Sequence, residues 1–196
     1  MNFEHIQGQD NLIDCRGIMN GCIIEILGNS NVIEIKKGVI LTNLKITIKG
    51  NNAKLLICEN VRIKAGELWL EDNFPELIIN RDVTIEEAHI AVTEDHSKII
   101  LDEDCMLAKG IEIRCGDSHS ILDENGIRIN PAKNIFIGKH VWIGSKAMIL
   151  KGVIIGQGSI VAAGSIVTKE IPEQTLVSGI PAKIIKQKIN WTRERI

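Results

Sequence analysis

An aliphatic residue recurs at every sixth position through much of the C-terminal half of this chain. A glycine or another small residue often follows it directly, and a small or branched residue usually lies four positions after it. A fixed short period of this kind indicates a repeat architecture, in which each repeat is one structural unit stacked on the next. The six aliphatic positions are Ile137, Ile143, Ile149, Ile155, Val161 and Val167.

The N-terminal half has a second period, of 22 residues. Successive copies occupy residues 32–53, 54–75, 76–97 and 98–119, and residues 10–31 form a weaker first copy. The copies end in polar corners, such as GNN, EDN and GDSH. Three apolar columns keep the spacing: Ile13, Ile35, Ile57, Ile79 and Leu101; Met19, Leu41, Ile63, Ile85 and Leu107; and Val39, Val61, Val83 and Cys105.

Within a copy, apolar residues alternate over short runs, as in Ile46-Thr47-Ile48, which is the period of a β-strand. Three short strands with their turns would make one coil of a solenoid, and identical columns would stack about 4.8 Å apart around an aliphatic core. The composition agrees, since the chain has no tyrosine and only three Phe and three Trp beside 44% hydrophobic residues. We therefore predict an all-β parallel solenoid in a single domain.

The two periods divide the chain into four parts. Residues 10–119 are predicted to form five 22-residue coils, residues 120–134 a protruding loop, residues 135–171 hexapeptide coils and residues 172–196 a C-terminal cap. A solenoid is open at its ends and needs a cap. Because the segment after Pro181 has no hexapeptide rhythm, we expect a short capping helix there.

Charge and cysteine content argue against several classes of protein. The 23 basic and 25 acidic residues are spread along the chain, with a formal net charge of −2, which does not favour a nucleic-acid partner. Five cysteines without a Cys-x-x-Cys pair suit a reducing cytoplasm better than a disulfide framework. The N-terminus does not read as a signal peptide, and the longest uncharged run, residues 152–168, is too short for a membrane span. We expect a soluble cytoplasmic protein.

The hexapeptide run and the segment HVWIGSKAMILKGVIIGQGSIVAAGSIVTKEIPEQTLVSGIPAKII resemble the hexapeptide-repeat acyltransferase superfamily, most strongly from about position 132 to position 186. The resemblance implies a left-handed parallel β-helix, a known exception to right-handed crossovers. It also implies a homotrimer with active sites between subunits, and acetyl-CoA as the donor. Within that superfamily, DSHSILDENGIRINPAKNIFIGKHVWIG is similar to a segment of bacterial surface-polysaccharide and sialic-acid O-acetyltransferases, in which a loop follows the active-site histidine.

The histidine that matches this pattern is His119, which becomes the candidate general base. Moving an acetyl group from a thioester to a sugar hydroxyl requires removal of the hydroxyl proton, and a positioned histidine typically contributes about 10²- to 10⁴-fold. The tetrahedral oxyanion needs a fixed N–H donor. The resemblance assigns that donor to the backbone of Ser145, after a Gly144 that lets the thioester approach, and it places Trp142 in the cleft between subunits.

The resemblance also implies contacts for coenzyme A and for the acceptor. The pantetheine arm would run along small residues of stacked coils, and lysines would serve as point charges for the phosphates. The candidate donor-binding residues are Trp142, Gly144, Ser145, Ala163, Gly164, Thr168, Lys169, Lys183 and Lys186. The candidate acceptor-binding residues are Asp117, which could also orient the catalytic histidine, and Asp123, Arg128 and Asn130 in the loop.

The predicted function is acetyl-CoA-dependent O-acetylation of a bacterial surface sugar, in capsule, O-antigen or sialic acid. Three alternatives stay open: an N-acetyltransferase acting on a nucleotide-linked amino sugar, a non-catalytic binding solenoid, and a γ-type carbonic anhydrase, whose zinc is held by three histidines shared across subunits. The five histidines, at positions 5, 89, 96, 119 and 140, show no pair with the expected ligand spacing, so no metal is expected.

Overall fold

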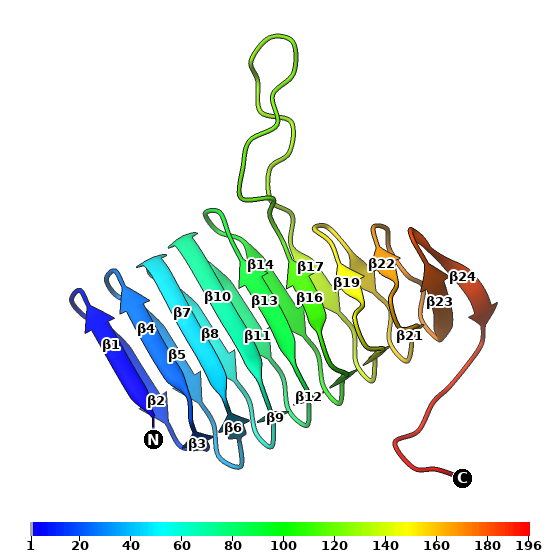
Figure 1. The fold of residues 1–196 in the computed structure, drawn as a ribbon, viewed down its shortest axis with the longest axis horizontal. Coiled ribbons are helices and arrows are strands. Elements are labelled where there is room, and N and C mark those ends of the chain that lie inside the picture. The colour runs from blue at the N-terminus through cyan, green and yellow to red at the C-terminus, as the bar shows by residue number, and fades with distance from the viewer. Residues whose placement is uncertain (1) are drawn as a thin grey trace.

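Short β-strands wind into a parallel solenoid with three faces in the computed structural model, which describes residues 2–196 (Figure 1). Sheet A consists of β1 (Phe3–Gln7), β4 (Ile23–Leu27), β7 (Leu44–Asn51), β10 (Gly66–Asn73), β13 (Ala88–Val92), β16 (Ile111–Arg114), β19 (Met148–Ile149) and β22 (Ile166–Val167). Sheet B consists of β2 (Leu12–Cys15), β5 (Val32–Ile35), β8 (Lys54–Ile57), β11 (Glu76–Ile79), β14 (Lys98–Leu101), β17 (Ile135–Ile137) and β20 (Ile154–Ile155). Sheet C consists of β3 (Ile18–Asn20), β6 (Ile40–Thr42), β9 (Arg62–Ile63), β12 (Thr84–Ile85), β15 (Met106–Leu107), β18 (Trp142–Ile143), β21 (Ile160–Val161), β23 (Thr175–Gly179) and β24 (Ala182–Gln187).

The strands send alternate side chains into one aliphatic core that runs the length of the solenoid. In β10, Leu68 and Leu70 are buried, whereas Glu67 and Trp69 between and beside them are only half-buried on the outer face. Each coil covers the apolar columns of its neighbours, so the favourable burial, about 25 cal/mol per Å², is shared between adjacent coils. The predicted left-handed β-helix is confirmed as the fold class.

The strand register confirms the 22-residue period in the middle of the chain and corrects it at the start. Ile35, Ile57, Ile79 and Leu101 lie in register, as predicted. Cys15 precedes them in this column, and the prediction that Ile13 would do so is wrong. The reason is that the first coil is two residues shorter on this side, so β2 pairs with β5 at a spacing of 20 residues.

The polar corners between sheets A and B stack through side-chain hydrogen bonds. Asn29 donates to Asn51 over 3.2 Å, Asn51 donates to Asn73 over 3.1 Å, and Asn73 donates to Asp95 over 3.1 Å. Each of these steps is 22 residues long in the sequence. Short polar side chains are therefore needed at these corners because they satisfy one another as well as the turns.

One corner of the solenoid carries a long projection. The chain leaves the coil after β16, rises away from the body as an arm (residues 116–134) and returns at β17 (Figure 1). A backbone bridge between Leu122 and Arg128 holds the two limbs of the arm together. The predicted loop at 120–134 lies within this arm.

The C-terminal end differs from the prediction, because no helix forms after Pro181. Instead β24 folds back antiparallel on β23 and adds a strand to sheet C. The prediction of a capping helix was wrong because β23 is an open sheet edge, and pairing with that edge satisfies the backbone groups of residues 182–187. None of the elements in residues 2–196 is a helix long and apolar enough to cross a membrane.

Candidate active site

The base of the arm is fixed by a network of polar contacts around Asp117. Lys151, one coil further on, donates to the Asp117 carboxylate over 2.5 Å and to the carbonyl of Asn130 over 3.0 Å. Asn130 is buried, and its amide donates to Asp117 and to the backbone carbonyl of His119, each over 2.9 Å. The hydrogen bond from Lys151 lowers the pKa of Asp117 below its ordinary value, and the bond from Asn130 acts in the same direction.

His119 lies at the corner where the arm begins, and its side chain is exposed. Its backbone N–H donates to the carbonyl of Asp117 over 2.7 Å. Within residues 2–196, the imidazole ring has no hydrogen-bond partner, and the bonds that Lys151 and Asn130 donate to Asp117 both end on Oδ2. The structure joins Asp117 and His119 through the backbone of the corner, and orientation of the ring by the Asp117 carboxylate stays a prediction.

The two predicted acceptor residues further out have contacts of their own in the arm. Arg128 forms a bidentate pair with Glu94 on the preceding coil, over 2.9 and 2.5 Å, which ties the arm to the body. Asp123 accepts hydrogen bonds from the backbone N–H groups of Asn125 and Ile127 over 2.9 and 2.8 Å and so closes the tip of the arm. These contacts give both residues a structural task, and their contact with an acceptor stays a prediction.

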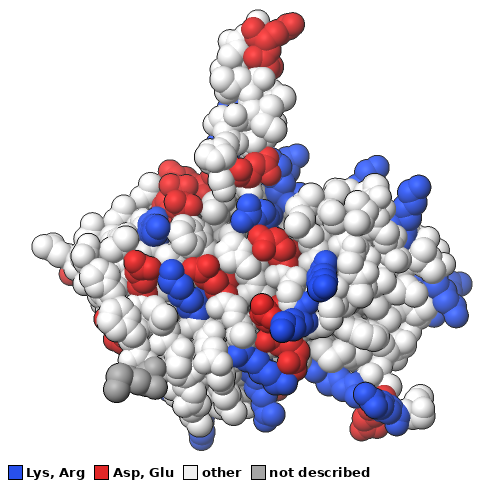
Figure 2. Space-filling view, in the orientation of Figure 1, with Lys and Arg blue, Asp and Glu red and all other residues white. Residues whose placement is uncertain are grey.

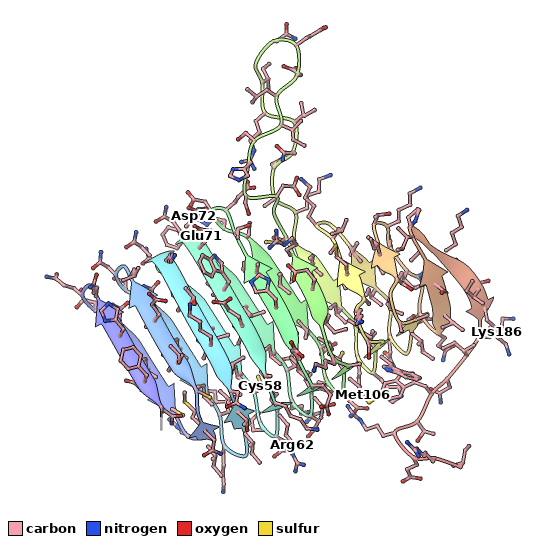
Figure 3. The ribbon with its side chains drawn as sticks, in the orientation of Figure 1. Cys58, Arg62, Glu71, Asp72, Met106 and Lys186 are labelled. Carbon is pink, nitrogen blue, oxygen red and sulfur yellow. The ribbon has the colours of Figure 1, made fainter. Side chains whose placement is uncertain are left out.

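Trp142 lies on a different face, in sheet C. Its strand β18 lies between β15 and β21, so that Trp142 is in register with Met106 on one side and Ile160 on the other. The indole is 37% exposed, which leaves much of it available to a ligand or a partner. Figure 3 labels Met106 on the side of the solenoid away from the arm.

Gly144 and Ser145 form the turn that follows β18. A side chain on Gly144 would come within 2.6 Å of the backbone nitrogen of Ala163 and 2.9 Å of the carbonyl of Val161, so the next coil already requires glycine there. The carbonyl of Ser145 accepts a hydrogen bond from Gly164 over 2.8 Å, which fixes the turn. Within residues 2–196, the Ser145 N–H has no backbone acceptor, so it can donate to a ligand.

The C-terminal strap (residues 189–195), which the sequence had not marked as functional, packs on His140 in the turn that precedes β18. Trp191 is 8% exposed and stacks on His140, with ring centroids 4.0 Å apart and planes 6° from parallel. Its indole N–H donates to the His140 carbonyl over 2.8 Å, and its own carbonyl lies 3.0 Å from His140 Nε2. Arg193 donates to Asp104 and to the hydroxyl of Thr84, each over 2.9 Å.

The strap supports the exposed tryptophan of β18. The rings of Trp191 and Trp142 are 6.0 Å apart between centroids and tilted by 48°, which is a favourable geometry for an aromatic pair. Burial raises the pKa of Asp104, but hydrogen bonds from His140 and Arg193 outweigh that effect, so the pKa ends below its ordinary value. The sequence offered one signal for this contact: Trp191 is a large aromatic residue in a tail that has no repeats, where a buried residue would not otherwise be expected.

The predicted coenzyme A residues fall into two groups. One group shares the side of Trp142: Ala163 and Gly164 stack on the turn at Ser145, and β24 carries Lys183 and Lys186. Trp142, Ile160 and Leu176 are in register on β18, β21 and β23. Lys186 on β24 is in register with Leu176, so it lies three strands from Trp142 in the same column. Figure 3 shows Lys186 at the C-terminal end of the solenoid.

The other group, Thr168 and Lys169, follows β22 in sheet A. These two residues therefore lie at the corner between sheets A and B, which is the corner of His119 and not that of Trp142. The candidate residues of a single chain thus form two separate groups on different corners, one around His119 and one around Trp142, which are two candidate half-sites.

The other histidines and the cysteines do not gather into a further site. Residues 2–196 contain no group of three or more His, Cys, Asp or Glu side chains that could hold a metal ion. The histidines have separate partners: His89 lies 3.0 Å from Glu112, His96 stacks on Phe74, and His140 lies 2.6 Å from Asp104. Burial raises the pKa of the Cys105 thiol to about 12, which agrees with its place in the valine column of the core.

Comparisons with known proteins match different parts of the chain. The family model described as bacterial transferase hexapeptide (six repeats) matches residues 134–169. The polysialic acid O-acetyltransferase of Escherichia coli O1:K1 / APEC is 47% identical over 91 residues, 46% of this chain and 30% of that protein. The polysialic acid O-acetyltransferase of Neisseria meningitidis is 35% identical over 135 residues, 67% of this chain and 62% of that protein. The chain thus aligns with less than two thirds of the length of either relative.

Two solved structures match along nearly the full length. The polysialic acid O-acetyltransferase OatWY superimposes with a TM-score of 0.94 at 34% identity, covering 100% of this chain and 93% of that chain. The polySia specific acetyltransferase NeuO superimposes with a TM-score of 0.90 at 34% identity, covering 98% of this chain and 89% of that chain. The similarity therefore includes the N-terminal 22-residue coils as well as the hexapeptide coils.

Proposed function

The chain belongs to the hexapeptide-repeat acyltransferase superfamily, and on that premise we propose that it transfers an acetyl group from acetyl-CoA to a hydroxyl of a sialic-acid-containing surface polysaccharide. The observation that carries this proposal is the full-length match to a polysialic acid O-acetyltransferase. Fold alone would not justify it, because one fold hosts many activities. The added support is that the His119 side chain is exposed and that the Ser145 N–H has no backbone acceptor within residues 2–196, as a base and an N–H donor require.

In the proposed reaction, His119 accepts the proton of the acceptor hydroxyl as its oxygen attacks the thioester carbonyl carbon. A carbon–oxygen bond forms, and the tetrahedral oxyanion accepts a hydrogen bond from the Ser145 N–H. When the intermediate collapses, the carbon–sulfur bond breaks and the coenzyme A thiolate takes the proton back from His119. Trp142 forms a wall that excludes water from the thioester.

The reaction needs both half-sites, so we infer a homotrimer in which the arm corner of one subunit faces sheet C of the next. The arm supports this inference because it exposes four aliphatic side chains, each by more than half. They are Ile121 (56%), Leu122 (56%), Ile127 (63%) and Ile129 (60%). Apolar surface gathered on one projection indicates a protein contact. All five cysteines are free thiols, which supports a cytoplasmic location beside the acetyl-CoA pool.

The test is an acetyl-transfer assay with acetyl-CoA and a panel of acceptors: sialic acid oligomers, neutral capsule fragments and nucleotide-linked amino sugars. We expect transfer to the sialic acid oligomers, and His119→Ala should lower kcat at least about 100-fold while the oligomer stays folded. His96→Ala is the matched control, since His96 is also a corner histidine but stacks on Phe74. Transfer only to an amino sugar, or near-normal turnover by His119→Ala, would contradict the proposal.

A further inference from the structure

The outer face of sheet A has a gap beside the arm. Trp69, Ala91 and Arg114 are in register on β10, β13 and β16, so the two large side chains flank a single methyl group. Two strand spacings separate them, about 9.6 Å. The result is a groove of about 260 Å³ with Ala91 as its floor, which is the scale of one small ring and not of a whole polymer.

The wall of this groove nearest the arm contains a hydroxyl without a partner. Thr93 is 7% exposed, and its Oγ1 has no hydrogen-bond partner among residues 2–196. Gly116 and Ser118, at the start of the arm, line the groove beside it. Less than 1 Å² of the Oγ1 atom is accessible, so this hydroxyl lies behind the groove wall and does not face the groove.

Arg114, across Ala91 from Trp69, has N–H donors without a partner. Arg114 uses only Nε in its pair with Glu112, over 2.9 Å, and its two terminal nitrogens have no protein partner within residues 2–196. A guanidinium presents such a pair of N–H groups to a carboxylate in bidentate geometry. Arg114 can therefore hold a carboxylate while it remains paired with Glu112.

The other walls suit a sugar ring. Trp69 supplies an aromatic face, and its orientation is held by the Nε1 hydrogen bond to Glu71 over 3.1 Å and by Lys49, whose Nζ lies 4.5 Å from the ring centroid. Glu67 accepts a hydrogen bond from Thr47, so this carboxylate is already engaged. Figure 2 shows acidic and basic side chains interspersed on the face below the arm, and Figure 3 labels Glu71 near the arm base.

We propose that this groove binds one acidic sugar residue of the acceptor, with its carboxylate on Arg114 and its apolar face on Trp69. The inference rests on the proposed function and names the residues that make that function specific for an acidic acceptor. Ser118 lines the groove and directly precedes His119 in the chain, so a sugar bound there sits next to the base. The acceptor thus binds on the subunit that provides the histidine.

The test compares Michaelis constants in the full-length protein, with a sialic acid oligomer and its carboxyl methyl ester as acceptors. Arg114→Gln should raise the KM for the oligomer at least about tenfold with kcat nearly unchanged, and should have no effect on the KM for the ester. Trp69→Leu should raise the KM for both about fivefold, because the sugar ring loses the aromatic face that lines the groove. Arg81→Gln, which breaks an Arg–Glu pair away from the groove, is the control and should change neither constant.

Calorimetric binding of the same oligomer separates this inference from the proposed function. Binding that Arg114→Gln weakens, without any acetyl transfer by the wild type, would overturn the function and keep the groove. Transfer by the wild type with an unchanged acceptor KM in both variants would overturn the groove and keep the function. A rise in the KM for acetyl-CoA instead would show that Arg114 meets the donor, which also contradicts the inference.

Discussion

At the scale of single residues, the position of His119 depends on a charge pair that does not touch its ring. Lys151 binds Asp117 and the carbonyl of Asn130 together, and Asn130 in turn holds the His119 carbonyl. The corner is thus held by a lysine from the following coil, which fixes the start of the arm before any acceptor binds.

This pair predicts how the corner responds to acid. Because the pKa of Asp117 is lowered in the folded protein, the pair is fully formed above the ordinary Asp pKa of about 3.9 and is lost as the pH falls through the lower, folded value. We expect protease cleavage within the arm to stay slow down to about pH 4 and to rise below it. Asp117→Asn should be cleaved quickly at neutral pH, and Asp14→Asn, which breaks an Asp–Arg pair in the first coil, serves as the control.

Equal cleavage of wild type and Asp117→Asn at pH 7 would contradict this role for the pair. The experiment is sensitive to the arm alone because the coils on either side keep their own strand pairing.

Residue types could be read from the sequence where the repeat breaks, and less well where it does not. His119 stands where the 22-residue repeat ends, and the family resemblance marked it together with Trp142. Arg114 was not marked, because its meaning depends on which side chain occupies the neighbouring coil in the same column. Outward-facing residues that are neighbours in a column lie about 22 positions apart in the sequence and follow no pattern. The groove over Ala91 could therefore be recognised only once the strand register was known.

At the scale of elements, β24 replaces the predicted helix. The helix prediction failed because residues 182–187 pair with the open edge of β23. That pairing is a contact with another strand, and the helix propensity of the segment alone does not predict it. The coils themselves were predictable, because each keeps the same aliphatic columns and polar corners.

The strap predicts a link between the tail and the site. Trp191→Ala removes a nearly buried indole and its hydrogen bond to His140, which should weaken docking of the strap by about 3 kcal/mol. Amide exchange at residues 189–195 should accelerate, and kcat should fall because Trp142 loses its aromatic neighbour. Trp191→Phe should restore much of both.

Glu194→Ala is the control within the same strap, because the Glu194 side chain is in none of the ion pairs formed by residues 2–196. Slow exchange in Trp191→Ala would show that Arg193 alone holds the tail. An accelerated exchange with unchanged kcat would show that the strap does not support Trp142.

At the scale of the whole molecule, the two candidate half-sites lie on different faces, and the proposed homotrimer would complete a site between two copies. This arrangement predicts complementation between inactive proteins. His119→Ala and Trp142→Ala subunits, unfolded and refolded together in equal amounts, should recover about one quarter of wild-type activity, since random mixing joins an intact histidine to an intact tryptophan at that fraction of interfaces.

Each variant refolded alone is the control and should stay inactive. No recovery in the mixture, with mixed oligomers verified by differently tagged subunits, would mean that both residues act from one chain. That outcome would contradict the inferred assembly while leaving the acetyl-transfer activity open to its own assay.

The corner ladder that links Asn29, Asn51, Asn73 and Asp95 at 22-residue steps has a consequence for how such proteins change over time. A coil that ends in the same corner as its neighbours is interchangeable with them, so a duplicated or deleted stretch of 22 codons would leave every remaining contact in register. Gene length in the N-terminal half can therefore drift in whole coils, lengthening or shortening the surface ahead of the histidine without altering the chemistry behind it.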